Sequence, residues 1–300
     1  MKKISFYIKE NIFKSYLLIS LFLIFTIAIG WFFSYLFGSR FILYLAVFLS
    51  FFQAFLSYFF SDKIILSMVR AKKMKKEGFP EIYEMVEKLS KRAQIPMPRL
   101  YLIEESQPNA FATGRDPEHA AVVFTQGLLE KLEKPELEGV IGHELSHIKN
   151  RDILLSSIVV VLVGVVALIS DFFLRSLIFF GARRDEMDRG GGFLLILGII
   201  AAILAPLAAT LIQLAISRKR EFLADASSAF LTKNPEGLAR ALEKIASDKT
   251  PLKVASSANS HLFIASPLKG ETAKNWLAKL FMTHPPIEER VKALREMKIS

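Results

Sequence analysis

Long hydrophobic runs without charge alternate with polar stretches along this chain. Residues 16–37 and 41–60 each carry no charged residue over roughly twenty positions, which is enough to cross the hydrocarbon core of a bilayer. The tight turn Gly38-Ser39-Arg40 separates them, so the two runs predict a transmembrane hairpin. Lysine and arginine precede the first run and follow the second. By the positive-inside rule, both ends of the hairpin lie on the cytoplasmic side.

Two later hydrophobic runs predict a second hairpin. Residues 153–170 follow a polar helical stretch with no glycine or proline to interrupt it. Residues 193–216 follow a mixed-charge loop that ends in three glycines, and the basic run 217–220 comes directly after them. Four spans would put both termini on the cytoplasmic side. A hairpin buried in a soluble core is the alternative, but the length of the runs favours spans.

The segment between the hairpins has the composition of a soluble α+β domain. Residues 80–94 have an apolar helical face made of Ile82, Met85, Val86 and Leu89. Short runs separated by turn-forming residues predict a small sheet from residues 99–103, 109–113 and 120–125, and residues 126–132 predict a short helix.

These patterns predict a membrane protein that is mainly α, with about four transmembrane helices and a cytoplasmic α+β domain containing a small sheet. The expected division is a first hairpin at 1–62, the first part of the cytoplasmic domain at 63–152, a second hairpin at 153–216 and the second part of the domain at 217–300.

Composition limits the chemistry that is open to the chain. Hydrophobic residues make up 52% of the 300 residues, with 26 Phe, which is too apolar for an ordinary soluble domain. Cysteine is absent, so any metal site must use histidine and carboxylate ligands. The net charge of +10 lies beside the apolar runs, where anionic lipid explains it better than nucleic acid does. A glycine-rich phosphate loop is also absent, so we expect no nucleotide.

The segment from His143 to His147 reads HELSH, an instance of the HExxH pattern, in a run without proline from Glu136 onward. Residues i and i+4 share one face of a helix, so both imidazoles can reach one metal ion. Glu144 lies one step round the helix, where it can act as general base toward a water molecule. The pattern predicts one Zn²⁺ per chain and a metallohydrolase. A polar helix with a fortuitous pair of histidines is the alternative.

A catalytic zinc site needs a third protein ligand. Glu221 is preferred over several carboxylates and over the remaining histidines, His119, His261 and His284. His147 lies roughly 9 Å of helix before the third apolar run, and Glu221 lies roughly 7 Å after the fourth, so adjacent antiparallel spans would deliver both to one height. Asp225, one turn beyond Glu221, could accept the second ring N–H of a ligand histidine. A solvated helix face is the alternative for this pair of carboxylates.

Three motifs together resemble the HtpX-type membrane metalloproteases, relatives of the CAAX prenyl proteases: HELSHIKNRD at 143–152, REFLADA at 220–226 and THPPIEER at 283–290. The resemblance covers nearly the whole chain and implies a zincin-like domain. It implies the zinc ligands His143, His147 and Glu221. It implies a catalytic site completed by Glu144 as general base, His284 and Arg290, with Asn109 and Ala110 on a substrate-binding edge strand. It also implies a multi-pass protease of the bacterial plasma membrane that acts on misfolded membrane proteins.

The residues by themselves say less about these additional positions. An exposed strand edge at 109–111 could pair with an extended peptide, although Asn109 could equally be a turn residue after Pro108. His284 precedes two prolines on a rigid loop end suited to an oxyanion, but a surface role is equally open. Arg151 and Asp152 receive no role beyond the membrane-proximal helix face, and His119 and His261 are interpreted as structural.

Other functions fit the sequence less well. A CAAX-type prenyl-peptide protease would have more spans. An intramembrane protease would carry HExxH within an apolar span, whereas Glu136, Glu138 and Lys149 surround this one. A non-catalytic zinc-binding scaffold would not require Glu144. The sequence therefore predicts an integral-membrane zinc metalloendopeptidase.

Overall fold

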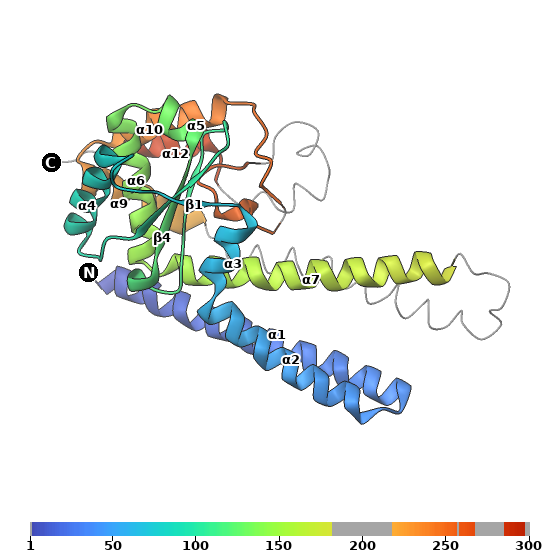
Figure 1. The fold of residues 1–300 in the computed structure, drawn as a ribbon. Coiled ribbons are helices and arrows are strands. Elements are labelled where there is room, and N and C mark those ends of the chain that lie inside the picture. The colour runs from blue at the N-terminus through green and yellow to red at the C-terminus, as the bar shows by residue number, and fades with distance from the viewer. Residues whose placement is uncertain (1, 182–217, 257, 268–284, 298–300) are drawn as a thin grey trace.

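The computed structural model describes the whole chain except residues 1, 182–217, 257, 268–284 and 298–300. It begins with the hairpin of α1 (Lys2–Phe37) and α2 (Arg40–Phe59), which extends away from the rest of the molecule (Figure 1). The turn between them uses Gly38 with a φ of 63°, a conformation that glycine adopts without strain. The predicted first hairpin is therefore present.

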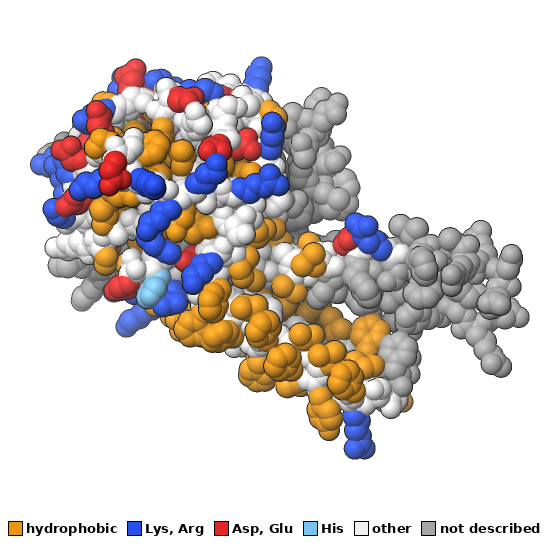
Figure 2. Space-filling model, in the orientation of Figure 1, with side chains coloured by type: hydrophobic (Ala, Val, Ile, Leu, Met, Phe, Trp, Pro, Cys, Tyr) orange, Lys and Arg blue, Asp and Glu red, His pale blue; other side chains and the backbone are white. Residues whose placement is uncertain are grey.

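The surface of the hairpin is apolar, and the surface of the domain at its base is charged (Figure 2). Large aromatic side chains such as Tyr35 and Phe41 remain 81% and 69% exposed. Within the hairpin, the helical stretches Ile8–Tyr35 and Arg40–Phe59 are each long and apolar enough to cross a membrane. Exposure of this kind suits contact with lipid rather than water.

The domain contains a four-stranded sheet with the strand order β1-β2-β4-β3. Strands β2 and β4 pair in parallel, and β1 and β3 pair antiparallel to their neighbours. The predicted helix and strands are confirmed within a residue or two; β1, in the basic stretch after the first hairpin, was not predicted. The elements up to α5 are α3 (Ser61–Met68), β1 (Lys72–Lys73), α4 (Pro80–Ala93), β2 (Arg99–Ile103), β3 (Ala110–Thr113), η1 (Pro117–His119), β4 (Ala121–Thr125) and α5 (Gln126–Lys131).

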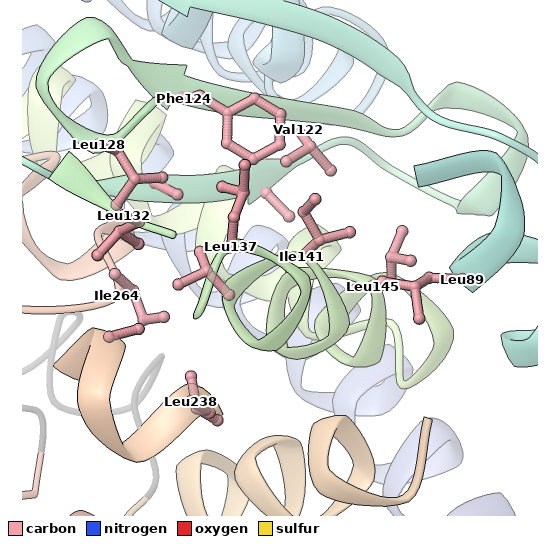
Figure 3. Packing of buried hydrophobic residues seen from close by; sticks show 14 of the residues in the cluster. Leu89, Val122, Phe124, Leu128, Leu132, Leu137, Ile141, Leu145, Leu238 and Ile264 are labelled. Atoms are coloured by element: carbon pink, nitrogen blue, oxygen red, sulfur yellow. The ribbon is translucent and has the colours of Figure 1, made fainter. Parts of the chain in front are cut away.

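Helix α6 (Lys134–Lys149) runs through the centre of the domain and carries the HELSH motif. Its residues Leu137, Ile141 and Leu145 are buried with Leu89 of α4 and Phe124 of β4 (Figure 3). The helix begins with a capping box between Glu133 and Glu136, which satisfies backbone N–H groups at its first turn. The core therefore fixes α6 on several sides.

Two glycines of α6 let the later helices come close to it. These helices are α9 (Arg218–Thr232) and α10 (Pro235–Ser247), followed by η3 (Ser260–Leu262) and α12 (Ile287–Arg295). A Cβ on Gly142 would lie 2.8 Å from Ser228 Oγ of α9, and one on Gly139 would lie 2.7 Å from the backbone nitrogen of Leu238 of α10. Because the core includes Leu89 as well as Leu242, segments before and after the second pair of apolar runs form one domain.

The HELSH helix and the third apolar run form separate helices, although no glycine or proline interrupts the sequence between them. Helix α6 ends at Lys149, and α7 (Asp152–Gly181) follows it. The axis of α7 over Asp152–Leu168 lies at an angle of 83° to the axis of α6. Arg151 has a φ of 60°, in the left-handed region, so a non-glycine residue makes the break. Helix α7 then packs along α1 through a cluster that includes Leu18 and Ile158.

The number of membrane spans is only partly described. Among the described residues, two helices could cross a membrane, and a third crossing results only if α6 and α7 are taken together as one bent span. The expected fourth span, 193–216, lies outside the described residues.

Candidate functional site

Three side chains from two helices meet beside the core. His143 and His147 lie on α6 with their Nε2 atoms 3.1 Å apart. Glu221, on α9, places its Oε1 3.6 Å from His147 Nε2 and its Oε2 3.8 Å from His143 Nε2. When one ligand atom is taken from each of the three residues, the three atoms lie within 4.8 Å of one another. A single cation could therefore contact all three.

The charges around the cluster favour a cation. Burial by itself would lower the pKa of His147, but its hydrogen bond to Asp152 and the charge of Glu221 raise this pKa to about 9. Burial lowers the pKa of His143, which keeps that imidazole neutral, as a metal ligand must be. The field that favours a proton on His147 also favours a metal ion in its place.

The donor set fits a zinc ion. Two imidazole nitrogens and one carboxylate are a common set of protein ligands in catalytic zinc sites, which leave a fourth position open. Among the residues that the structure describes, His143, His147 and Glu221 form the one group of this kind that could hold a metal. Each histidine also has a carboxylate beside its other ring nitrogen, Asp225 for His143 and Asp152 for His147.

Asp225 lies behind His143, one helical turn beyond Glu221. The Nδ1 atom of His143 is 2.9 Å from Asp225 Oδ1, which leaves Nε2 directed at the cluster. Burial by itself would raise the pKa of Asp225, but the Arg290 guanidinium lowers it and keeps the carboxylate charged. A charged acceptor on Nδ1 fixes the tautomer of the histidine and its orientation.

Arg290 contacts the ligand residues rather than the open part of the site. Its side chain is fully buried, donates to both oxygens of Asp225 and lies 3.4 Å from Glu221 Oε2. It also donates to the backbone oxygen of Ile264 at 2.9 Å. The sequence suggested a catalytic role for Arg290. Its burial among ligand residues instead points to positioning of Asp225 and Glu221.

Asp152 is a site residue that sequence reasoning missed. Its Oδ2 lies 2.9 Å from His147 Nδ1, the same relationship that Asp225 has with His143. On an unbroken helix, position i+5 would face away from His147, since each residue turns the helix by about 100°. The break at Arg151 turns Asp152 back toward the motif. A carboxylate five residues after His147 was the signal available in the sequence, but no glycine or proline marks the turn that brings it back toward the motif.

Glu144 is buried and borders the same space. Burial raises its pKa to about 7, with Glu221 adding to the rise and the positive charges of His147 and Arg290 opposing it. The backbone N–H of Ala112 favours the charged carboxylate and so also opposes the rise in this pKa. A carboxyl group with a pKa near neutrality can both accept and return a proton, which suits a general base.

A small cavity of about 40 Å³ adjoins the cluster. Its walls combine polar and apolar groups from α6, α7, α9, β3 and the η3 region, including Glu144, Ser156, Arg220, His261 and Phe263. A space of this size holds water but no large side chain. His261 therefore lines the site, whereas His119 lies apart from it and is hydrogen-bonded to Asp116 through Nδ1.

The expected exposed edge at residues 109–111 is covered in the structure. Strand β3 is the last in the sheet, but the backbone oxygen of Ala110 accepts from Ile264 N at 3.0 Å. The side-chain amide of Asn109 donates to the backbone oxygen of Ala265 at 3.0 Å, and both Asn109 and Ala110 are buried. A later segment of the chain thus occupies the groups expected to bind substrate. The remaining predicted catalytic residue, His284, lies outside the described residues.

The sequence that contains this site matches a known protein family. Residues 76–298 match the model for "Peptidase family M48". The chain is 47% identical over 294 residues to "Protease HtpX homolog" of Thermoanaerobacter pseudethanolicus, covering 96% of each protein. It is 52% identical over 244 residues to the protein of the same name from Syntrophobacter fumaroxidans, covering 80% of this chain and 84% of that one.

Among solved structures, the crystal structure of S. mikatae Ste24p matches with a TM-score of 0.48 and 18% identity, covering 98% of this chain and 67% of that one. The family match spans every described residue of the cluster around His143, His147 and Glu221. The chain is a membrane metalloprotease and belongs to peptidase family M48.

Proposed function

We propose that this chain is an integral-membrane zinc metalloendopeptidase, which hydrolyses peptide bonds of membrane and cytoplasmic proteins. The observation that carries this proposal is the convergence of His143, His147 and Glu221 on one point, with Glu144 beside them. The three residues would hold one Zn²⁺ per chain. When bound, zinc would supply Lewis acidity that activates water and polarises a peptide carbonyl.

The protein's own groups would handle the proton. Glu144 would accept it from the attacking water and return it to the leaving amine, and a pKa near 7 suits both transfers. Asp225 and Asp152 would hold the two imidazoles so that their Nε2 atoms stay directed at the metal.

Substrate would bind along β3 at Ala112 rather than at Asn109 and Ala110. Alternate residues of a strand face the same edge, so Ala112 shares the outer edge with Ala110. Ala110 is already bonded to Ile264, whereas Ala112 lines the cavity next to Glu144. We propose that the backbone oxygen of Ala112 accepts an N–H of an extended peptide. His284 remains our candidate for stabilising the oxyanion, on the basis of the motif alone.

The cellular role and location are further parts of the proposal. The relatives named HtpX support a role in quality control of misfolded membrane proteins. The distribution of lysine and arginine along the sequence supports a multi-pass protein of the bacterial plasma membrane, with the catalytic domain and both termini in the cytoplasm.

Zinc content and casein cleavage of the detergent-purified protein, compared with those of Glu144→Gln, test the function. We expect about one zinc per chain in both proteins and cleavage only by the unaltered one, because Glu144 acts on the proton without binding the metal. Cleavage that survives in Glu144→Gln, or protein without zinc in either case, would refute the proposal. Zinc without cleavage in the unaltered protein would favour a metal-binding scaffold.

A further inference from the structure

Asn11 of the first membrane helix reaches the metal-binding region. It is 2% exposed, although it lies within the helical stretch Ile8–Tyr35. Its Nδ2 donates to Asp152 Oδ1 at 2.7 Å and to the backbone oxygen of Asn150 at 3.0 Å. Its Oδ1 accepts from Arg220 Nη1 at 2.8 Å. Both ends of the amide are thus bonded, and the three partners fix which way it points.

Each partner of Asn11 is next to a proposed metal ligand. Asp152 uses its other oxygen to hold His147 Nδ1 at 2.9 Å. Arg220 directly precedes Glu221 in α9. Asn150 forms the C-cap of α6, where its N–H bonds to Ser146 within the motif. One amide therefore joins three chain segments that are distant in sequence: α1, the junction of α6 and α7, and α9.

The charges explain why an amide is needed at this point. Asp152 and Arg220 are both buried, and their nearest atoms are 3.6 Å apart, beyond hydrogen-bond length. Asn11 lies between them, giving a donor to the carboxylate and an acceptor to the guanidinium. Without it, Asp152 would turn toward Arg220, because a buried charge seeks a hydrogen-bonded partner. That rotation would draw Oδ2 away from His147.

We propose that Asn11 is a positioning residue of the metal centre, through which the first membrane helix sets the orientation of His147 and the placement of Glu221. The proposal rests on the metal site proposed above. It makes the membrane hairpin part of the site as well as its anchor. A change in the position of α1 would then alter metal affinity.

The test measures zinc affinity of full-length protein by chelator competition and the visible absorption spectrum of the Co²⁺-loaded protein. Asn11→Ala should weaken zinc binding about 10-fold, within the range typical of residues that support metal ligands, and should change the Co²⁺ spectrum. Ser15→Ala is the matched control. Ser15 is equally buried one turn further along α1, and its hydroxyl bonds to the backbone oxygen of Asn11 in the same helix. It should leave both readouts unchanged.

Exchanging the amide of Asn11 with the carboxylate of Asp152 distinguishes a positioning role of Asn11 from a packing role. Asn11→Asp should weaken zinc binding more than Asn11→Ala, since it places a second carboxylate against Asp152. In Asn11→Asp combined with Asp152→Asn, the new amide at position 152 can donate to the new carboxylate and still accept from His147. The double variant should bind zinc more tightly than Asn11→Asp. Its affinity and Co²⁺ spectrum should approach those of Asp152→Asn alone, which lacks only the charge of the carboxylate on His147 Nδ1.

Several results would overturn the proposal. One is that Asn11→Ala and Ser15→Ala have the same zinc affinity and the same Co²⁺ spectrum. Another is that Asn11→Ala lowers the unfolding temperature of the metal-free protein but leaves zinc affinity unchanged. If Asn11→Ala does not fold, the comparison of Asn11→Asp with the double variant decides, and a double variant that binds zinc no more tightly than Asn11→Asp overturns the proposal. Unaltered protein that binds neither metal would instead refute the proposed function.

Discussion

Arg290 donates to Asp225 through two hydrogen bonds, from Nε to Oδ2 at 2.8 Å and from Nη2 to Oδ1 at 2.7 Å. Both side chains are buried, at 0% and 1% exposure, and Asp225 in turn contacts His143 Nδ1. A guanidinium matches a carboxylate in this two-point geometry, whereas an ammonium group acts as a point charge. The relationship therefore fixes the plane of the Asp225 carboxylate as well as its charge.

Arg290→Lys should loosen that fixed geometry and lower zinc affinity by about 10- to 100-fold, as the loss of a supporting contact to a ligand usually does. Chelator competition measures this affinity, with casein cleavage at saturating zinc as the second readout. Normal zinc affinity combined with lost cleavage would show that Arg290 acts on the substrate and would restore the catalytic role that the sequence suggested.

Glu221→Ala and Asp225→Asn should differ in severity. The first removes a proposed ligand and leaves two histidines, so zinc should be lost at micromolar chelator. The second removes a contact behind His143 and should cost only about 10- to 100-fold in affinity. Zinc analysis after dialysis against chelator ranks the two variants. The reverse order would mean that Asp225 is the ligand and Glu221 the supporting residue.

Zinc binding should release protons and strengthen as pH rises. The pKa of His147 is raised from 6.5 to about 9, so this imidazole is protonated at neutral pH in the metal-free protein. Zinc requires the neutral form, so binding near pH 7.5 should release about one proton from His147. Affinity should then rise with pH until about 9, the pKa of His147, is reached. Calorimetry in buffers of different ionisation enthalpy counts the protons.

Asp152→Asn provides the control for proton release. It removes the charged partner that raises the pKa of His147, so fewer protons should be released at the same pH. A binding enthalpy that does not depend on the buffer in the unaltered protein would contradict the expected charge state of His147.

Gly139→Ala should destabilise the domain that contains α6 and α10. The new Cβ would lie 2.7 Å from the backbone nitrogen of Leu238 and 2.8 Å from its Cα. Displacing backbone atoms costs more energy than displacing the end of a flexible side chain. Overpacking of this kind typically costs about 1–3 kcal/mol. Gly164→Ala in α7 is the matched control, since its Cβ would meet nothing within 4 Å. Equal effects of the two substitutions on the thermal unfolding midpoint would argue against close packing of α6 and α10.

The topology of the chain can be tested with reporters of compartment. A reporter fused near Arg184 should read periplasmic, and one fused after Ser300 should read cytoplasmic, because basic residues border the apolar runs on one side. A cytoplasmic signal at the first position would remove the second hairpin from the proposal. A periplasmic signal at the second would require an odd number of spans.

Local pattern in the sequence was sufficient for several features. The first hairpin follows from two long uncharged runs, and α4 follows from helical periodicity. Strands β2, β3 and β4 follow from short runs separated by turn-forming residues. The pairing of His143 with His147 follows from their spacing on a helix, which the core then buries. These features depend on residues that are close in the chain, so a pattern within one segment determines them.

Contacts that depend on the direction of the backbone were decided by the tertiary structure. Asp152 meets His147 because the chain turns at Arg151 in a left-handed conformation, and no glycine or proline marks that turn in the sequence. The edge of β3 is covered because Ile264 returns to bond with Ala110. In both cases the direction that the backbone takes decides which polar groups meet. Spacing along the chain carries no information on that direction.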